Sequence, residues 1–282
     1  NNPLALNSGE VTSIEKSKDG IYFFGQDVRG VIVYDPNSLR NIEKADGIRN
    51  GRVGNIGYDK SNRLWISQFN GDGGIHRIEN EQVVEEINFE NGLPSSQVTD
   101  FDFSSDGKMW ISTVEGLAVC DLKSKNIIKY GKENGLQNIN IRSIAVDKND
   151  VVWLFTPSGL IRFDGDAFTL YNQDDGLVRP RFNGDVNIDK KGNIIYSTYG
   201  SGFSIFNGKD FVNYDDSNGM VDARIWDLGV DSKNNYWLAL DGSGVQMFNG
   251  ESFVHYDIED GVGAGETWSV FVDDFDMVWI GT

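Results

Sequence analysis

One segment pattern recurs along the whole chain: a turn with Asn-Gly or Asp-Gly, a strand, a second turn, and a strand with an aromatic residue. It is clearest at 91–133 and 218–259. The marker residue of the second strand falls at Phe23, Trp65, Trp110, Trp153, Ile195, Trp237 and Trp279. Successive markers lie 42, 45, 43, 42, 42 and 42 residues apart. A fixed period of this length, with four strand-like segments in each repeat, is typical of a β-propeller in which each repeat forms one blade.

The repeat predicts an all-β fold: a seven-bladed β-propeller of four-stranded antiparallel blades, which we call strands A to D from the axis outward. In the repeat at 91–133 we expect these strands at 97–104, 109–113, 117–122 and 126–130. Blades bury their apolar faces only against their neighbours, so we expect 1–282 to form a single domain. The expected blades are 9–45, 46–90, 91–133, 134–174, 175–217, 218–259 and 260–282. The last is incomplete, because it contains strands A and B alone, and we expect its outer strands to come from a longer parent protein.

Composition excludes several classes of function. A net charge of −18 argues against binding to nucleic acid or to anionic lipid, since both need clustered positive charge. No apolar run is long enough to span a membrane. The chain starts without Met, so we expect a processed product or an excised piece. Cys120 is the only cysteine, and its strand-like surroundings predict a small core residue.

The segments "NGLPSSQVTDFDFSSDGKMWIST" and "DMVWIGT" resemble the two-component regulator propeller repeat. The resemblance covers about 9–282 and is weak at 11–45 and 176–217, where Phe23 and Ile195 replace tryptophan. This family is similar to the extracytoplasmic sensor half of hybrid histidine kinases, which often sense saccharides. The resemblance therefore implies a periplasmic or extracellular sensor domain that signals to a kinase outside this fragment.

Aligning the repeats on the marker separates packing positions from variable ones. The positions nine and seven residues before the marker are apolar in almost every repeat, which predicts packing between blades. The tryptophan markers belong to the same class. The position thirteen residues before the marker varies: Glu10, Arg52, Gln97, Asn140, Phe182, Arg224 and Glu266. The position eleven residues before it also varies: Thr12, Gly54, Thr99, Arg142, Gly184, Trp226 and Trp268. Variable positions on a repeated scaffold are typical of a binding site.

Chain direction places the start of every A strand at one mouth of the central channel, on the face that carries the D-to-A and B-to-C connections. Six of the eleven arginines lie just before or at such a start: Arg49, Arg52, Arg142, Arg179, Arg181 and Arg224. Guanidinium groups suit carboxylate, sulfate or phosphate, and two tryptophans in adjacent blades suit a sugar face. The predicted ligand-binding residues are Arg52, Gln97, Asn140, Arg142, Arg181, Arg224, Trp226, Glu266 and Trp268. The alternative is that these arginines pair with neighbouring carboxylates such as Glu10.

Catalytic and metal sites are weakly indicated. The position ten residues before the marker is short and polar and includes Asp100, Asp185 and Asp227. These aspartates suit a hard cation, although bonding to neighbouring backbone is the commoner use of such residues. The pair Glu10 and Glu266 allows carboxylate catalysis without being specific for it. The two histidines, His76 and His255, fall on expected C and D strands, distant from the channel mouth. We predict no catalytic residue, no metal and no cofactor.

The sequence thus favours a non-catalytic sensor that binds an oligosaccharide, or another small polar ligand, at the channel mouth. We expect no nucleic acid partner, no direct membrane insertion and a possible homodimer through the parent protein. One alternative is a propeller lyase resembling the streptogramin-inactivating enzymes, which use a histidine with a metal. Another is a protein-interaction or dimerisation platform.

Overall fold

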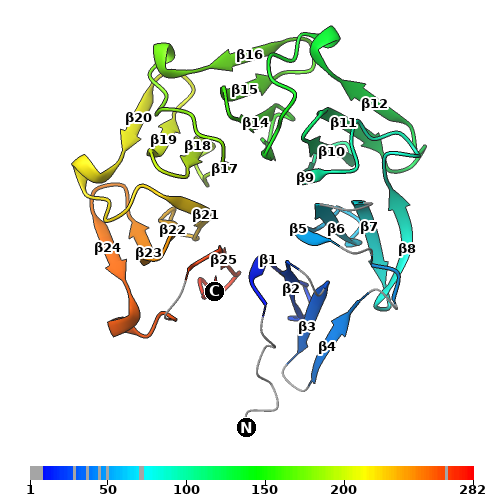
Figure 1. Ribbon diagram of the computed structural model, residues 1–282, viewed down its shortest axis with the longest axis horizontal. Helices are drawn as coiled ribbons and strands as arrows, with labels where there is room; N and C mark the ends of the chain where they lie inside the picture. Colours follow the sequence, from blue (N-terminus) through cyan, green and yellow to red (C-terminus); the bar gives the residue numbers. More distant parts are fainter. Residues whose placement is uncertain are drawn as a thin grey trace.

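The computed structural model describes residues 9–27, 30–35, 38–43, 46–48, 51–69, 73–263 and 266–282. These residues form a ring of small antiparallel sheets around a central axis (Figure 1). Within each sheet the strands follow the sequence order from the axis outward. The predicted all-β propeller is therefore confirmed.

The first three blades occupy the amino-terminal half of the chain. Blade one contains β1 (Val11–Lys16), β2 (Tyr22–Gln26), β3 (Val31–Asp35) and β4 (Ser38–Ile42). Blade two contains β5 (Arg52–Tyr58), β6 (Leu64–Phe69), β7 (Gly74–Glu79) and β8 (Gln82–Ile87). Blade three contains β9 (Val98–Phe103), β10 (Lys108–Thr113), β11 (Gly116–Asp121) and β12 (Ile127–Tyr130), each within one residue of the predicted boundaries.

The remaining blades continue around the ring. Blade four contains β13 (Ser143–Val146), β14 (Val152–Thr156), β15 (Gly159–Phe163) and β16 (Phe168–Tyr171). Blade five contains β17 (Gly184–Ile188), β18 (Ile194–Thr198), β19 (Gly202–Phe206) and β20 (Phe211–Tyr214). Blade six contains β21 (Ile225–Val230), β22 (Tyr236–Leu240), β23 (Gly244–Phe248) and β24 (Phe253–Tyr256). Single 3₁₀ turns precede four of the sheets: η2 (Lys132–Asn134), η3 (Gln173–Asp175), η4 (Asp216–Asn218) and η5 (Ile258–Asp260).

The prediction of seven blades requires correction, because the described chain forms six four-stranded blades. The last sheet has only two strands, β25 (Ser269–Val272) and β26 (Val278–Gly281). It lies in the ring between blades six and one, and β25 contacts both β21 and β1 (Figure 1). The physical reason is that no described segment pairs with the outer edge of β26.

Four of the five tryptophan markers, Trp65, Trp153, Trp237 and Trp279, are fixed by an aspartate at the turn before their strand. In blade two the Oδ1 of Asp59 accepts hydrogen bonds from the backbone N–H groups of Ser61 (2.8 Å) and Arg63 (3.0 Å). Its Oδ2 accepts from the indole Nε1 of Trp65 at 2.9 Å. Asp231 and Asp273 make the same set of bonds in later repeats. The recurring aspartate is therefore the turn residue that its position predicted.

The apolar core lies between blades. Trp65 of blade two is fully buried against blade three, where it packs in one cluster with Phe101 and Met109. Cys120 belongs to this cluster and is 1% exposed, which confirms its prediction as a core residue. Trp110 and Trp153 are buried in the same way, whereas Trp237 and Trp279 remain partly exposed. The tryptophans at the marker position are thus packing residues of the blades.

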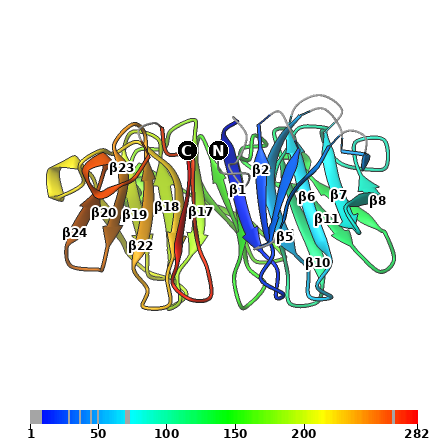
Figure 2. The ribbon, with the colours of Figure 1, turned by 90° about the horizontal axis from the view of Figure 1, so that it is seen from below.

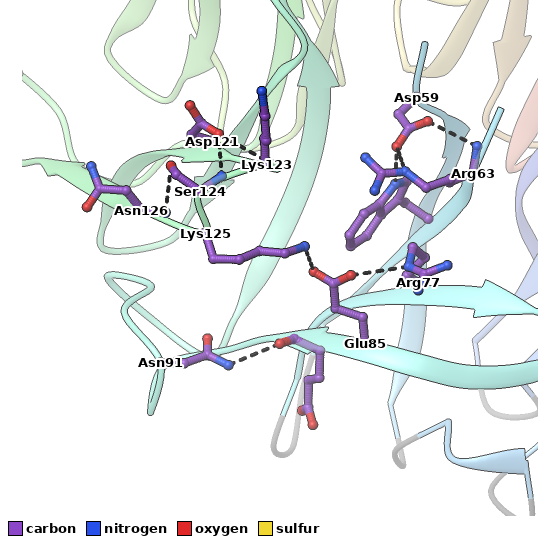
Figure 3. A network of polar contacts seen from close by, with 12 residues as sticks. Asp59, Arg63, Arg77, Glu85, Asn91, Asp121, Lys123, Ser124, Lys125 and Asn126 are labelled. Carbon is purple, nitrogen blue, oxygen red and sulfur yellow. Dashed lines mark hydrogen bonds and ion pairs between the residues drawn. The ribbon is translucent and has the colours of Figure 1, made fainter. Parts of the chain in front are cut away.

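Polar contacts link the blades at the periphery. Figure 3 shows Lys125, from the turn between β11 and β12, reaching across to Glu85 on β8, where its Nζ pairs with Oε1. The other carboxylate oxygen of Glu85 accepts from Nε of Arg77 on the neighbouring strand at 3.2 Å. Exposed ion pairs of this kind contribute little stability individually.

The two faces of the ring carry different connections (Figure 2). Nδ2 of Asn138, before β13, donates to Oγ of Ser158 between β14 and β15 at 2.7 Å. Nε of Arg181, before β17, donates to Oγ of Ser201 between β18 and β19 at 2.8 Å. The D-to-A and B-to-C connections therefore share one face, as predicted, and the A strands start there.

Candidate functional site at the channel mouth

A cavity of about 670 Å³ follows the axis of the ring. Its walls come from the innermost strands of all seven sheets, β1, β5, β9, β13, β17, β21 and β25, together with residues just before several of them. A cavity of this size is within the range of small-molecule sites.

All seven residues at the position eleven before the marker line this cavity: Thr12, Gly54, Thr99, Arg142, Gly184, Trp226 and Trp268. A β-bulge explains the placement in several blades. The pairing of innermost and second strands skips Thr12, Thr99 and Trp226. A bulge leaves one residue outside the ladder and redirects its side chain. In blades one, three and six the bulge therefore presents one variable residue to the channel.

The position thirteen before the marker behaves differently. Arg52 lines the cavity, but Gln97, Asn140, Arg224 and Glu266 are not among its lining residues. Gln97, Arg224 and Glu266 are exposed. The Oδ1 of Asn140 is buried without a hydrogen-bond partner, two residues before Arg142.

Arg142 is the least satisfied cation of the site. Its guanidinium lies 4.1 Å from the ring centroid of Phe182, and its Nε is buried without a hydrogen-bond partner. Burial lowers the pKa of this guanidinium. No carboxylate of the described residues lies within ion-pair distance of Arg142 or Arg52. A partly buried guanidinium with an unpaired Nε is incompletely satisfied, so this position is suited to an anion from outside.

Arg224 follows the alternative prediction of an internal ion-pair network. Its Nη2 lies 2.6 Å from Oδ2 of Asp222, and its Nη1 lies 2.5 Å from Oδ2 of Asp241. Arg181 is satisfied without a carboxylate, by Ser201 and by the carbonyl oxygen of Gly200 at 3.2 Å. Arg179 is exposed, and Arg49 lies outside the described residues. The five of these arginines that the structure describes therefore do not act as one cluster.

Three aromatic rings form a continuous group beside the mouth. The ring centroids of Trp226 and Trp268 are 4.7 Å apart, and those of Tyr199 and Trp226 are 4.6 Å apart. Asp241 fixes this group, because it accepts from the hydroxyl of Tyr199 at 2.7 Å and from Nε1 of Trp226 at 3.4 Å. The proximity of the two tryptophans agrees with the sequence analysis.

Sequence reasoning missed Tyr199, Asp241 and Phe69. All three lie four residues after the marker, at the end of the second strand. Phe69 lines the cavity, and the other two support Trp226. This position also varies between repeats, so the alignment that found the A-strand positions would have found these residues too.

Carboxyl groups line the deeper channel. Asp100 and Asp227 each bond to the backbone of their own strand and of the next blade, through Ile144 N (3.1 Å) and Val270 N (2.8 Å). These contacts satisfy the inner edges of the strands. Burial raises the pKa of both carboxyls to about 7. Within the described residues no group of histidine, cysteine or acidic side chains has an arrangement that would hold a metal ion.

The histidines lie away from the cavity, as predicted. His76 is on β7, His255 is on β24, and neither lines the channel. Nε2 of His255 bonds to the carbonyl oxygen of Ser243 at 2.6 Å. Among the described residues no helix has the length and apolar character of a membrane span.

Comparisons with known proteins agree with the fold. The chain is 26% identical over 227 residues to Histidine kinase P4 of Formosa agariphila, covering 75% of this chain and 16% of that protein. It superposes with a TM-score of 0.83 on the extracellular domain of the hybrid two-component system BT3049 from B. thetaiotaomicron, at 22% identity, covering 100% of this chain and 39% of that one. The chain thus spans a minor part of both proteins. No family model matches.

A different class of protein shares the fold. Virginiamycin B lyase from Staphylococcus aureus superposes with a TM-score of 0.77 at 12% identity, covering 97% of this chain and 92% of that one. These likenesses establish the propeller fold. Together with the kinase, the B. thetaiotaomicron structure supports the resemblance to the two-component regulator propeller family.

Proposed function

We propose that this propeller is a non-catalytic, extracellular ligand-sensing domain of a bacterial two-component regulator. The likeness to the extracellular domain of BT3049 and to a histidine kinase supports this class and this location. The signal would pass to a kinase outside residues 1–282. We also propose that residues 1–282 form a single domain. The ligand we propose is an acidic oligosaccharide, bound at the channel mouth.

The observation that carries the proposal is the pairing of an unsatisfied cation with an aromatic surface around one cavity. Arg142 has a buried Nε without a partner, and Trp226 and Trp268 line the same cavity. A guanidinium binds a carboxylate through a planar fork, and aromatic faces pack against the apolar faces of sugar rings. A saccharide that carries carboxylates matches both features, with Arg52 as a second cation on the cavity wall.

The decisive experiment is calorimetric titration with tetragalacturonic acid, using neutral maltotetraose for comparison. We expect binding of the acidic tetrasaccharide and at least tenfold weaker binding of the neutral one. Arg142→Ala should weaken binding by about 10- to 100-fold, the usual range for losing a hydrogen bond to a charged group.

Arg162→Ala is the matched control. Arg162 is a partly exposed arginine on β15 that pairs with Asp164 at 2.8 Å and does not line the cavity. This variant should bind like the wild type. Equal losses in both variants, or no binding of either saccharide, would contradict the proposed site.

A propeller lyase is the second candidate, because the likeness to virginiamycin B lyase covers almost the whole of both chains. Neither histidine of this chain lines the cavity, which argues for the sensor. Incubation with virginiamycin B, followed by mass spectrometry, distinguishes the two: the sensor leaves the antibiotic intact. Self-association through the parent protein stays a prediction.

We also propose that β25 and β26 are the inner half of a seventh blade. The marker spacing supports this, since Trp279 follows Trp237 by 42 residues, as in the complete repeats. The position of β25 between β21 and β1 is that of an innermost strand.

A further inference from the structure

Ser143 joins two carboxyl groups from different blades. Its Oγ lies 3.2 Å from Oδ2 of Asp100 on β9 and within hydrogen-bond distance of Oδ1 of Asp185 on β17. The same Oγ accepts from the backbone N–H of Val186 at 3.3 Å. A hydroxyl group carries one proton and can donate to only one carboxylate. The other contact is a hydrogen bond only if that carboxyl group carries a proton of its own.

The remaining acceptor positions of the two carboxyl groups are occupied by neutral donors. Asp100 accepts from Nδ2 of Asn55 at 2.6 Å and from the backbone of Phe101 at 2.7 Å. Asp185 accepts from the backbone of Val186 at 2.8 Å and from Nδ2 of Asn187 at 2.6 Å. No described cation lies within ion-pair distance of either group, so full ionisation would leave two negative charges with no counter-charge.

The other charged groups of the channel do not remove this excess. Burial raises the pKa of Asp100 to about 7, with the charge of Asp185 as the second cause, and burial also raises the pKa of Asp185. The groups facing the pair from the surrounding strands are Glu15 of β1, Arg52 of β5, Asp102 of β9, Arg142 before β13 and Asp227 of β21. Among the lining residues, β25 contributes no ionisable side chain. Carboxyl groups therefore outnumber arginines among the residues that line the channel.

We propose that Asp100 and Asp185 hold one shared proton through Ser143, and that loss of this proton weakens anion binding at the channel mouth. The inference rests on the proposed function, because it regulates that same site. Ser143 directly follows Arg142 in the chain, and both residues line the same cavity as Asp100 and Asp185. Ligand binding at the mouth is then coupled to protonation of the carboxyl groups in the channel.

The direction of the effect follows from Coulomb repulsion. Deprotonation adds a negative charge to the channel in which the anion would bind, so affinity should fall as the pH rises. In a partly polar medium, one added charge within the same cavity changes affinity by about 3- to 10-fold. By reciprocity, anion binding raises the proton affinity of the pair, so binding takes up protons near neutral pH.

The test is calorimetric titration of the whole chain with tetragalacturonic acid between pH 5.5 and 8.0 at constant ionic strength. Uronic acid carboxylates stay ionised across this range. We expect binding about 3- to 10-fold tighter at pH 5.5 than at pH 8.0. Titrations at pH 7 in phosphate and in Tris, which differ in ionisation enthalpy, should show net proton uptake. If the affinity changes by less than twofold between pH 5.5 and pH 8.0 and no protons are taken up, the inference is overturned.

Asp100→Asn removes one carboxyl group of the pair and should reduce the pH dependence to at most half of its wild-type size, the remainder coming from Asp227 and Glu15, whose pKa values burial also raises. Asp185→Asn provides a second variant if the first fails to fold. Asp216→Asn is the matched control, because this residue lies in the exposed η4 turn and changes the net charge equally. The control should keep the wild-type pH dependence, and a loss in the control equal to that in Asp100→Asn contradicts the role of the pair.

A direct titration separates this inference from the proposed function. Carbon-13 NMR of the aspartate carboxyl groups in the free protein reports whether one member of the pair stays protonated near neutral pH. If tetragalacturonic acid binds at no pH, the proposed function fails, and the titration alone decides on the shared proton. Both carboxyl groups ionising below pH 5 overturns it.

Discussion

Two arginines near the ends of D-to-A connections, at positions eleven and thirteen residues before the marker, have opposite environments. Arg224 is exposed and held by Asp222 and Asp241, whereas Arg142 is partly buried, stacks on Phe182 and has an Nε without a partner. The satisfied arginine orders the aromatic group beside it through Asp241. The unsatisfied arginine is the residue with capacity for a ligand anion. Residue type and spacing alone do not distinguish these roles.

At the same scale, Glu15 in the channel wall makes a prediction for stability. Its Oε1 accepts from the backbone N–H of Lys16 at 2.9 Å, and burial raises the pKa of its carboxyl group to about 7. A carboxyl group with a raised pKa binds its proton more tightly when folded. Its ionisation therefore lowers stability as the pH rises from about 4.5 through 7.

Glu15→Gln keeps the acceptor oxygen and removes this ionisation. The variant should be more stable than the wild type by about 2 kcal/mol at pH 8, with little difference at pH 4. Urea denaturation at both pH values measures this. A stability difference that does not change with pH would show that Glu15 is effectively solvated.

Much of the residue-level site was accessible from the sequence, and its limits are physical. Variation between aligned repeats predicted Trp226, Trp268 and Arg142 as channel residues. The ion-pair partners of Arg224 were missed, because Asp241 comes from the end of the second strand and meets Arg224 only after the blade folds. A buried atom without a partner, such as Nε of Arg142, is a property of packing and leaves no trace in the residue pattern.

At the scale of strands, the β-bulge exposes channel residues in blades one, three and six. Strand positions were predictable from turn residues and alternation, as in β9 and β12 of blade three. The bulge could not be predicted from these signals, because it is a shift in the pairing register between two strands. This shift skips Thr99 in blade three and Trp226 in blade six. Without it, alternation would send adjacent side chains to opposite faces. The bulge places both the variable residue and the following polar residue along the channel.

The outer edge of β26 has no partner strand among the residues that the structure describes. Trp279 packs with Tyr22 of blade one at a ring centroid distance of 4.3 Å, but both side chains remain partly exposed. In complete blades a third strand covers this region. Appending a copy of 241–256, the turn and outer hairpin of blade six, after Thr282 should therefore supply the missing strands.

The appended hairpin should raise the melting temperature by about 5 °C, since new apolar burial exceeds the cost of ordering the hairpin only modestly. The control carries Val245→Ser and Phe248→Ser in the appended copy, which removes two side chains that are buried in blade six. Calorimetric melting compares both with the original chain. Equal melting temperatures in all three would contradict the open-blade account.

At the scale of the whole molecule, the ring gathers residues that are far apart in the chain. Glu15 of β1 and Phe271 of β25, from the two ends of the described chain, line one cavity, and Figure 1 shows these two strands as neighbours in the ring. The 42-residue period predicted this closure because blades bury their apolar faces only against each other. The same pattern predicted that the last repeat contains only its two inner strands, and β25 and β26 agree with this.

Hydrogen–deuterium exchange with and without tetragalacturonic acid tests the central claim that ligand binds at the channel mouth. The account predicts slower exchange in peptides covering the starts of β13, β21 and β25, with no change in the outer strands β12, β16 and β24. Protection confined to the outer strands, or to the open edge of β26, would contradict it.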